Sequence, residues 1–259
     1  MYPKINFGTY RLGEKEINKS LETALKEGYN SIDTAPLYRN EALIGKFIKE
    51  NEIPRTSIWI TSKLNFKIIP KSENEIIESI KKTLEDLGTD YLDLYLIHAP
   101  VEKHIIKSWS ILEQFQKQGI IKNIGVSNFT IKHLEEITNF STTPIFTNQI
   151  ELSPFLTRNE LVYYMKKNNI PISAHSSLTK GEKLTEPILN EIATKYNKTP
   201  AQIMLKWGLQ NDYNVIPRSS NPCHIKENIN LDFVISDEDI KILNNLNCEY
   251  YTHPQYKYK

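Results

Sequence analysis

The sequence contains little cysteine and no long hydrophobic run, and each shortage excludes a class of protein. Its two cysteines, Cys223 and Cys248, are too few for a disulfide framework and lack the spacing of metal ligands. No run of about 18 apolar residues occurs, and the N-terminus lacks the apolar core of a signal peptide. We therefore expect a cytoplasmic protein with no membrane span and no bound metal.

An excess of charge of either sign is also absent. The chain has 32 Lys and Arg residues against 31 Asp and Glu residues, which gives a formal net charge of +1. Such a balance provides no overall field that would attract nucleic acid or an anionic membrane. We expect neither as a partner, so any charged ligand must be bound by local groups.

Short apolar segments, rich in β-branched and aromatic residues, alternate with longer segments of helical periodicity. No linker or change of composition interrupts this alternation, so we predict a single domain over residues 1–259. The longer segments include residues 17–27, 41–51, 72–87, 107–118, 159–168 and 199–209. The eight predicted strands lie in KINFGT, YNSIDTA, SIWITSKL, LDLYLIHA, IKNIGVSN, PIFTNQIEL, IPISAHSSL and NVIPRS.

Eight strands alternating with helices can form an open doubly wound sheet or a closed barrel. An open dinucleotide-binding sheet needs a G-x-G-x-x-G turn after its first strand, and Gly8 and Gly13 do not have that spacing. We therefore predict an α/β protein with the (β/α)8 fold, a TIM barrel. In this fold, candidate site residues lie at the C-terminal ends of the strands.

Polar side chains occupy the ends of three consecutive predicted strands. Asp33, Lys63 and His98 end the second, third and fourth strands, and Tyr38 follows shortly after Asp33. Each alone has an ordinary explanation, as a turn cap, a solvated strand end, a core histidine or a surface tyrosine. Together they indicate a site, because a buried lysine is costly without a carboxylate partner.

This set suits the protonation of a developing alkoxide, as in carbonyl reduction. A phenol has a pKa of about 10, so proton transfer near neutral pH requires a shift of roughly 3 units. We expect Asp33 to hold Lys63, and the ammonium of Lys63 to favour the phenolate of Tyr38. His98 would donate a hydrogen bond to a substrate oxygen.

The sequence resembles the aldo-keto reductase superfamily over almost its full length. The resemblance implies that Asp33, Tyr38, Lys63 and His98 form the catalytic tetrad, with Tyr38 as general acid and hydride supplied from C4 of a reduced nicotinamide. The matching stretches, in the family order, are GYNSIDTAPLYRNE, WITSKL, DYLDLYLIHAP, IGVSNF, TNQIELSPF and VIPRSSNPCHIKENI.

The resemblance further implies that NADP(H) is the cofactor, with NADPH favoured over NADH. Ser127, Asn128 and Gln149 would hold the nicotinamide carboxamide, and His175, followed by Ser176, stands where a stacking tyrosine is common. Arg218 replaces a common lysine beside the adenosine 2′-phosphate and keeps a positive charge. With Arg218, the residues implied to bind the phosphate and adenine are Ser219, Ser220, His224, Glu227 and Asn228.

Three departures from the family pattern affect the expected pocket. Ala99 replaces a tryptophan that often follows the catalytic histidine and would open one wall of the substrate pocket. Arg39 stands where glycine is usual, and the hairpin that usually closes the barrel floor is missing or minimal. We expect a small-molecule carbonyl substrate, either an aldehyde of modest size or an α-dicarbonyl, and a monomeric protein.

Two alternatives have a different chemistry. The first is a non-catalytic NADP(H)-binding regulatory subunit with the same fold, which would bind cofactor without turnover. The second is a metal-dependent barrel hydrolase using Asp33, His98 and His175, although the sequence has no H-x-H pattern to support it.

Overall fold

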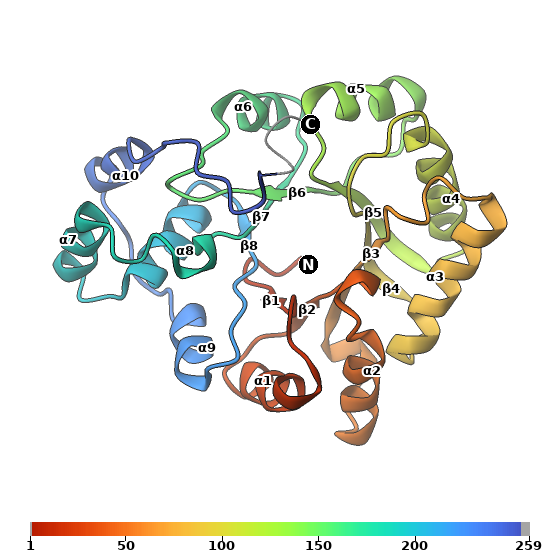
Figure 1. The fold of residues 1–259 in the computed structure, drawn as a ribbon, viewed down its shortest axis with the longest axis horizontal. Helices are drawn as coiled ribbons and strands as arrows, with labels where there is room; N and C mark the ends of the chain where they lie inside the picture. The colour runs from red at the N-terminus through yellow and green to blue at the C-terminus, as the bar shows by residue number, and fades with distance from the viewer. Residues whose placement is uncertain (1, 255–259) are drawn as a thin grey trace.

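Eight parallel strands form the centre of the molecule and confirm the predicted barrel (Figure 1). The computed structural model describes residues 2–254. Hydrogen bonds from Asn6 N to Val215 O and from Gly8 N to Pro217 O, of 2.8 and 2.9 Å, join the first strand to the last. The strands are β1 (Phe7–Gly8), β2 (Ser31–Asp33), β3 (Trp59–Leu64), β4 (Leu92–Ile97), β5 (Ile121–Ser127), β6 (Asn148–Glu151), β7 (Ile172–His175) and β8 (Asn214–Val215).

Helices surround the sheet and cover its outer face (Figure 1). The helix before β4 shows how the sequence sets their ends: Ser72 Oγ accepts from Glu75 N at 3.3 Å, and Glu75 Oε2 accepts from Ser72 N at 3.1 Å, which is the predicted capping box. The α-helices are α1 (Glu14–Lys26), α2 (Glu41–Glu50), α3 (Glu73–Leu87), α4 (Ile105–Lys117), α5 (Ile131–Phe140), α6 (Asn159–Lys167), α7 (Pro187–Lys195), α8 (Pro200–Gln210), α9 (Pro222–Ile229) and α10 (Asp237–Asn244).

The strand register brings the polar strand ends to one level of the barrel. Asp33 on β2 pairs with Thr61 on β3, and Lys63 pairs with Leu96 on β4. Neighbouring strands also approach closely here, because a Cβ at Gly125 on β5 would lie 2.6 Å from a backbone oxygen of the next strand segment. The glycine of the GVSNF stretch is thus required by packing between strands.

The floor of the barrel is closed by Tyr2. Its ring packs against Trp59 and Phe146, with ring centroids 5.2 and 5.5 Å apart, and its hydroxyl lies 3.2 Å from Ser173 Oγ. Burial raises the pKa of the Tyr2 phenol, so the hydroxyl remains protonated there. One tyrosine from the segment before β1 therefore packs at the N-terminal end of the barrel, against residues from three other parts of the chain.

A buried carboxylate joins α2 to the outer side of β3. Glu41 accepts hydrogen bonds from Ser62 Oγ at 2.5 Å and from Thr83 Oγ1 at 3.4 Å, and it is only 4% exposed. Burial raises the pKa of Glu41 to about 7, because hydroxyl donors compensate only part of the lost hydration. The start of α2 is thereby fixed beside the strand that carries Lys63.

Across residues 2–254, the helices are all too short or too polar to cross a membrane.

The raised pKa of Glu41 predicts that the stability of the protein depends on pH. Its pKa in the folded protein is about 7, against an ordinary value of 4.5, so the folded state binds more protons between these pH values. The free energy of unfolding therefore falls as pH rises through this window. In Glu41→Gln the fall should be smaller by about 3 kcal/mol, as urea denaturation from pH 4 to 8 would measure. Glu191→Gln, on the exposed surface of α7, is the matched control; equal pH profiles for the two variants would contradict the assignment.

Candidate active site

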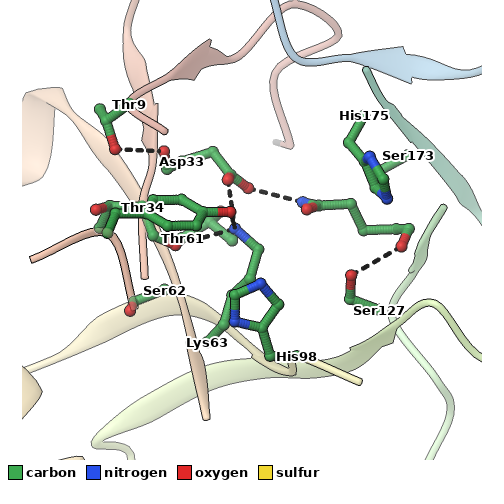
Figure 2. A network of polar contacts seen from close by, with 12 residues as sticks. Thr9, Asp33, Thr34, Thr61, Ser62, Lys63, His98, Ser127, Ser173 and His175 are labelled. Carbon is green, nitrogen blue, oxygen red and sulfur yellow. Dashed lines mark hydrogen bonds and ion pairs between the residues drawn. The ribbon is translucent and has the colours of Figure 1, made fainter. Parts of the chain in front are cut away.

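Four predicted site residues meet at the C-terminal ends of β2, β3 and β4. Asp33 ends β2, Lys63 is the penultimate residue of β3, and His98 follows β4 directly. Tyr38 comes from η1 (Pro36–Tyr38), a short 3-10 helix after β2. Figure 2 shows the amine of Lys63 directed at the Asp33 carboxylate, with the imidazole of His98 beside it. Residues distant in sequence thus form one cluster at the barrel rim.

Lys63 is the centre of this cluster. Its side chain is fully buried, and its amine donates to a carboxylate oxygen of Asp33, to Thr34 O at 3.0 Å and to Tyr38 OH at 3.5 Å. Burial by itself lowers the pKa of Lys63, but the charge and hydrogen bond of Asp33, together with Tyr38, outweigh this effect and raise it. The amine is therefore a permanent cation in contact with a phenolic oxygen.

Both carboxylate oxygens of Asp33 have partners. One pairs with Lys63, and the other accepts a hydrogen bond from Gln149 Nε2 at 2.7 Å. The backbone oxygen of Asp33 accepts from Thr9 Oγ1 at 3.0 Å (Figure 2). Lys63 on β3 and Gln149 on β6 therefore hold the carboxylate, and Thr9 holds the backbone of the same residue, so the position of Asp33 does not depend on the lysine alone.

His98 is a neutral imidazole at the same rim. Burial, and then the nearby charge of Lys63, hold its pKa well below the ordinary value of 6.5. Its ring lies edge-on to that of Tyr38, with centroids 5.8 Å apart. Within residues 2–254, its Nδ1 atom is buried without a hydrogen-bond partner. A buried polar atom of this kind is costly in a folded protein and indicates a functional position.

Asn40 secures the loop that carries Tyr38, and sequence reasoning missed it. Its Nδ2 donates to Thr9 O and Leu12 O at 2.8 and 3.0 Å, and its Oδ1 accepts from Thr34 Oγ1 at 2.9 Å. An asparagine before a helix is ordinarily read as a cap. Here the side chain makes no cap to α2 and instead joins the loops after β1 and β2.

Arg39 and Ala99, two positions where the sequence departs from the family pattern, directly follow Tyr38 and His98. Arg39 adopts φ 58°, in the left-handed region that favours glycine, which explains why glycine is usual at this position. Ala99 is buried at 4% exposure, directly after His98. The side chain of Ala99 fills less space beside His98 than a tryptophan side chain would.

The residues implied to hold a nicotinamide form a second cluster, opposite the first. Asn128 has φ 61°, a left-handed conformation that asparagine tolerates, at the end of β5. Its amide donates to His98 O and to Ser127 Oγ, both at 3.1 Å, while its oxygen lies 2.9 Å from His175 Nε2. Ser127 Oγ in turn donates to Gln149 O at 2.9 Å.

His175 is held between this cluster and the following turn. Its Nδ1 lies 3.0 Å from Ser176 Oγ, and Ser176 has a left-handed φ of 55°. Burial is the main cause that holds the pKa of His175 well below its ordinary value, and the neighbouring His253 adds to it. A neutral His175 donates from Nε2 to Asn128 and accepts at Nδ1 from the serine hydroxyl.

The residues implied to bind a phosphate lie after β8. Arg218 donates to Tyr10 O and Arg11 O at 2.9 Å each, and Asn221 caps α9 by accepting from Cys223 N at 2.9 Å. Ser220 and His224 are exposed and Glu227 is half-buried, whereas Ser219 and Asn228 are buried. The two bonds of Arg218 place this group beside the loop after β1.

Arg11 is a second guanidinium that sequence reasoning missed. It has a left-handed φ of 61°, and it lies close enough to Arg218 to contribute to the lowered pKa of that residue, after the larger effect of burial. Glu16 acts on Arg218 in the opposite direction. Two adjacent guanidinium groups with one nearby carboxylate form a local excess of positive charge that suits a phosphate.

A metal site is not supported by the geometry. In the part of the chain that the structure describes, no three His, Cys, Asp or Glu side chains come together as metal ligands. Both carboxylate oxygens of Asp33 are already occupied by Lys63 and Gln149.

Comparison with known proteins identifies the family. The model of the Aldo/keto reductase family matches residues 4–247, and the chain belongs to this family of oxidoreductases. It is 38% identical over 251 residues to the methylglyoxal reductase DkgB of Escherichia coli O157:H7, covering 95% of this chain and 93% of the relative. It is 35% identical over 280 residues to glycerol 2-dehydrogenase (NADP(+)) of Saccharomyces cerevisiae, covering 95% and 88%.

A solved structure has the same fold. The crystal structure of MGS-M4, an aldo-keto reductase enzyme from a Medee basin deep-sea metagenome library, superimposes with a TM-score of 0.93 at 33% sequence identity. The match covers 97% of this chain and 93% of that one.

The buried ion pair can be tested by its effect on stability. Lys63→Met leaves the Asp33 carboxylate buried without its cation, so the free energy of unfolding should fall by about 3–5 kcal/mol. Lys63→Met combined with Asp33→Asn should restore part of this loss, because no unpaired charge remains. Lys82→Met, which breaks only ion pairs on the surface of α3, is the control and should change stability little. A Lys63→Met protein as stable as the wild type would contradict the buried pairing.

Proposed function

We propose that this protein reduces aldehydes or ketones to alcohols with NADPH. The observation that carries the proposal is the buried ammonium of Lys63, which contacts both the Asp33 carboxylate and the Tyr38 hydroxyl beside a neutral His98. Carbonyl reduction needs a proton donor and a hydrogen-bond donor that converge on one oxygen, and this arrangement supplies both.

Tyr38 is the proton donor in this proposal. The nearby cation of Lys63 stabilises the phenolate that remains after proton transfer, which lowers the cost of transfer near neutral pH. Asp33 and Thr34 O hold the amine, so the cation cannot move away from the phenol. His98, being neutral, carries one ring proton that can be donated to the carbonyl oxygen and thereby orient it.

The residues that the structure describes fit NADPH as cofactor. When bound, its reduced nicotinamide supplies the hydride from C4. Asn128, Gln149 and His175 present amide and imidazole groups opposite the tetrad and would hold the nicotinamide. Arg218 and Arg11, together with the N-terminal end of α9, would hold the 2′-phosphate. The preference for NADPH over NADH rests on this local positive charge.

The substrate we propose is a small aldehyde or an α-dicarbonyl compound. A relative with 38% identity is named a methylglyoxal reductase, which supports this substrate class. Ala99 beside His98 is consistent with it, since it leaves one wall of the pocket without a bulky aromatic side chain. We further propose that the protein acts as a monomer.

Removal of the Tyr38 hydroxyl tests the chemistry. With a nitrobenzaldehyde or methylglyoxal as substrate, Tyr38→Phe should lower kcat by about 10²–10⁴-fold, the usual contribution of a general acid. NADPH affinity, measured by fluorescence titration, should change little. Cofactor binding by the wild type without turnover of any aldehyde would instead favour the non-catalytic regulatory subunit.

Removal of the Arg218 guanidinium tests the cofactor. Arg218→Ala should weaken NADPH binding by about 10–100-fold, which corresponds to the loss of one charge-assisted hydrogen bond. The affinity for NADH should change much less. Arg218→Lys should recover part of the NADPH affinity. Lys226→Ala, which removes an exposed cation from the same helix α9, is the control. Equal losses for NADPH and NADH in Arg218→Ala would refute the phosphate assignment.

A further inference from the structure

A cavity lies between the starts of two helices, α5 and α6, which are neighbours in Figure 1. Its volume is about 580 Å³, within the range of about 300–1,000 Å³ that small-molecule sites occupy. The segment after α10 completes its wall with Asn247, Glu249 and Tyr251. Among residues 2–254, those that line the cavity include none of the groups proposed to bind NADPH or to transfer a proton. We call it the α5/α6 cavity.

Arg158, directly before α6, lines this cavity with an unused guanidinium group. Only part of the side chain is exposed, and its Nη1 atom is completely buried without a hydrogen-bond partner in residues 2–254. Its guanidinium carbon lies 6.0 Å from the centre of the Tyr251 ring. A charge withdrawn from water is costly unless it is paired and hydrogen bonded. A guanidinium in this state at a cavity wall therefore points to a ligand.

The buried carboxylate that acts on Arg158 has other partners. Glu151 is only 2% exposed and accepts from Thr252 N and Thr252 Oγ1 at 2.6 Å each and from His253 N at 3.3 Å. Burial lowers the pKa of Arg158, while Tyr251 and Glu151 act in the opposite direction through their charge. Since an arginine in a protein keeps its proton, the guanidinium remains a cation with free donors.

The start of α6 adds further donors beside this cation. The side chain of Arg158 makes no cap to the helix. The first three helical residues, Asn159, Glu160 and Leu161, all line the cavity, and their backbone N–H groups donate to no acceptor within residues 2–254. Free N–H groups at a helix start attract anions, because the helix dipole places partial positive charge there.

A buried hydroxyl next to Arg158 is also without a partner. Thr157 is 5% exposed, and its Oγ1 atom makes no hydrogen bond in the part of the chain that the structure describes. Its backbone N–H donates to Asn247 Oδ1 at 3.2 Å, which joins it to the opposite wall of the cavity. Buried polar groups without partners are uncommon in folded proteins. Two in succession, Thr157 and Arg158, independently indicate a polar ligand at this place.

The charges around the α5/α6 cavity favour an anion beside Arg158. Lys132, near the start of α5, adds a second cation, whose ammonium lies 3.4 Å from the exposed carboxylate of Glu102. Glu160 and Glu249 also line the cavity, and both are exposed. Water screens exposed carboxylates more than it screens a partly buried guanidinium. The wall at Arg158 is therefore positive, and the rim carries charges of both signs.

We propose that the α5/α6 cavity binds a phosphate group carried by a small organic compound. The planar fork of Arg158 suits two phosphate oxygens, and the first three N–H groups of α6 and the ammonium of Lys132 are available to the remaining oxygen. These donors outnumber what the two oxygens of a carboxylate accept, whereas a phosphate group presents three acceptor oxygens. The cavity is larger than a bare phosphate ion requires, so the organic part lies towards the rim at Glu249.

This site differs from the 2′-phosphate site proposed at Arg218, and it does not depend on the reductase function. Isothermal titration calorimetry with sn-glycerol 3-phosphate tests it, in Arg218→Ala protein so that binding at the proposed cofactor site is suppressed. Adding Arg158→Gln should weaken binding by about tenfold or more, because a bidentate charge-assisted contact is lost. Lys167→Gln, which removes an exposed cation from the last turn of α6, is the matched control and should leave the affinity unchanged.

Two further variants should change the affinity in opposite directions. Lys132→Gln removes the second cation and should weaken binding by about two- to fivefold. Glu249→Gln removes a repelling carboxylate and should strengthen binding by a similar factor. Both side chains are exposed, so neither change should disturb folding, and the pair tests the site if Arg158→Gln does not fold.

The outcomes also identify the source of the phosphate group. Tighter binding of sn-glycerol 3-phosphate than of inorganic phosphate supports an organic ligand, whereas equal binding would retain the phosphate site and overturn the organic part. An affinity unaffected by Arg158→Gln, or no binding at millimolar concentrations, would overturn the inference as a whole. A loss of NADPH affinity in Arg158→Gln as large as that in Arg218→Ala would assign the cavity to the cofactor and overturn its separate role.

Discussion

The site depends on a cation buried in the barrel and held by one carboxylate. Removing an ammonium from water costs several kcal/mol, and the Asp33 carboxylate compensates for that cost only if it is held in place. Gln149 and Thr9 provide this support from other parts of the rim. Once the pair is fixed, the Tyr38 hydroxyl lies beside a positive charge that the solvent does not screen.

Most of the fold follows from patterns in the sequence. All eight strands were predicted, because buried parallel strands are apolar and β-branched over short lengths. The helices with a clear amphipathic pattern, such as α3, were predicted with nearly correct ends. Helices α5, α7 and α10 lie outside the segments named from the sequence. What closes the floor could not be predicted either, because Tyr2 fills it through packing with distant residues.

The clustering of Asp33, Lys63 and His98 was predictable, because each residue type is unusual for its position. A lysine, an aspartate and a histidine at the ends of consecutive strands are predicted to lie close together, because alternate side chains of each strand face the inside of the barrel. Asn40 and Arg11 gave no such signal, because each is an ordinary residue for a turn or a loop. The role of Asn40 depends on contacts with a loop far away in the chain, as with its bond to Thr9 O. The cofactor roles inferred from family resemblance remain predictions.

The hydrogen bond between Gln149 and Asp33 couples the two sides of the barrel mouth. The residues proposed for proton transfer come from β2 to β4 and the loops that follow them, whereas most of the groups proposed to hold the dinucleotide come from β5 to β8 and the loops after them. Gln149 Nε2 donates to the Asp33 carboxylate, and Asn128 Nδ2 donates to His98 O, so each side holds a residue of the other. A substitution at position 149 would therefore disturb the carboxylate that holds Lys63 together with any group bound beside β6.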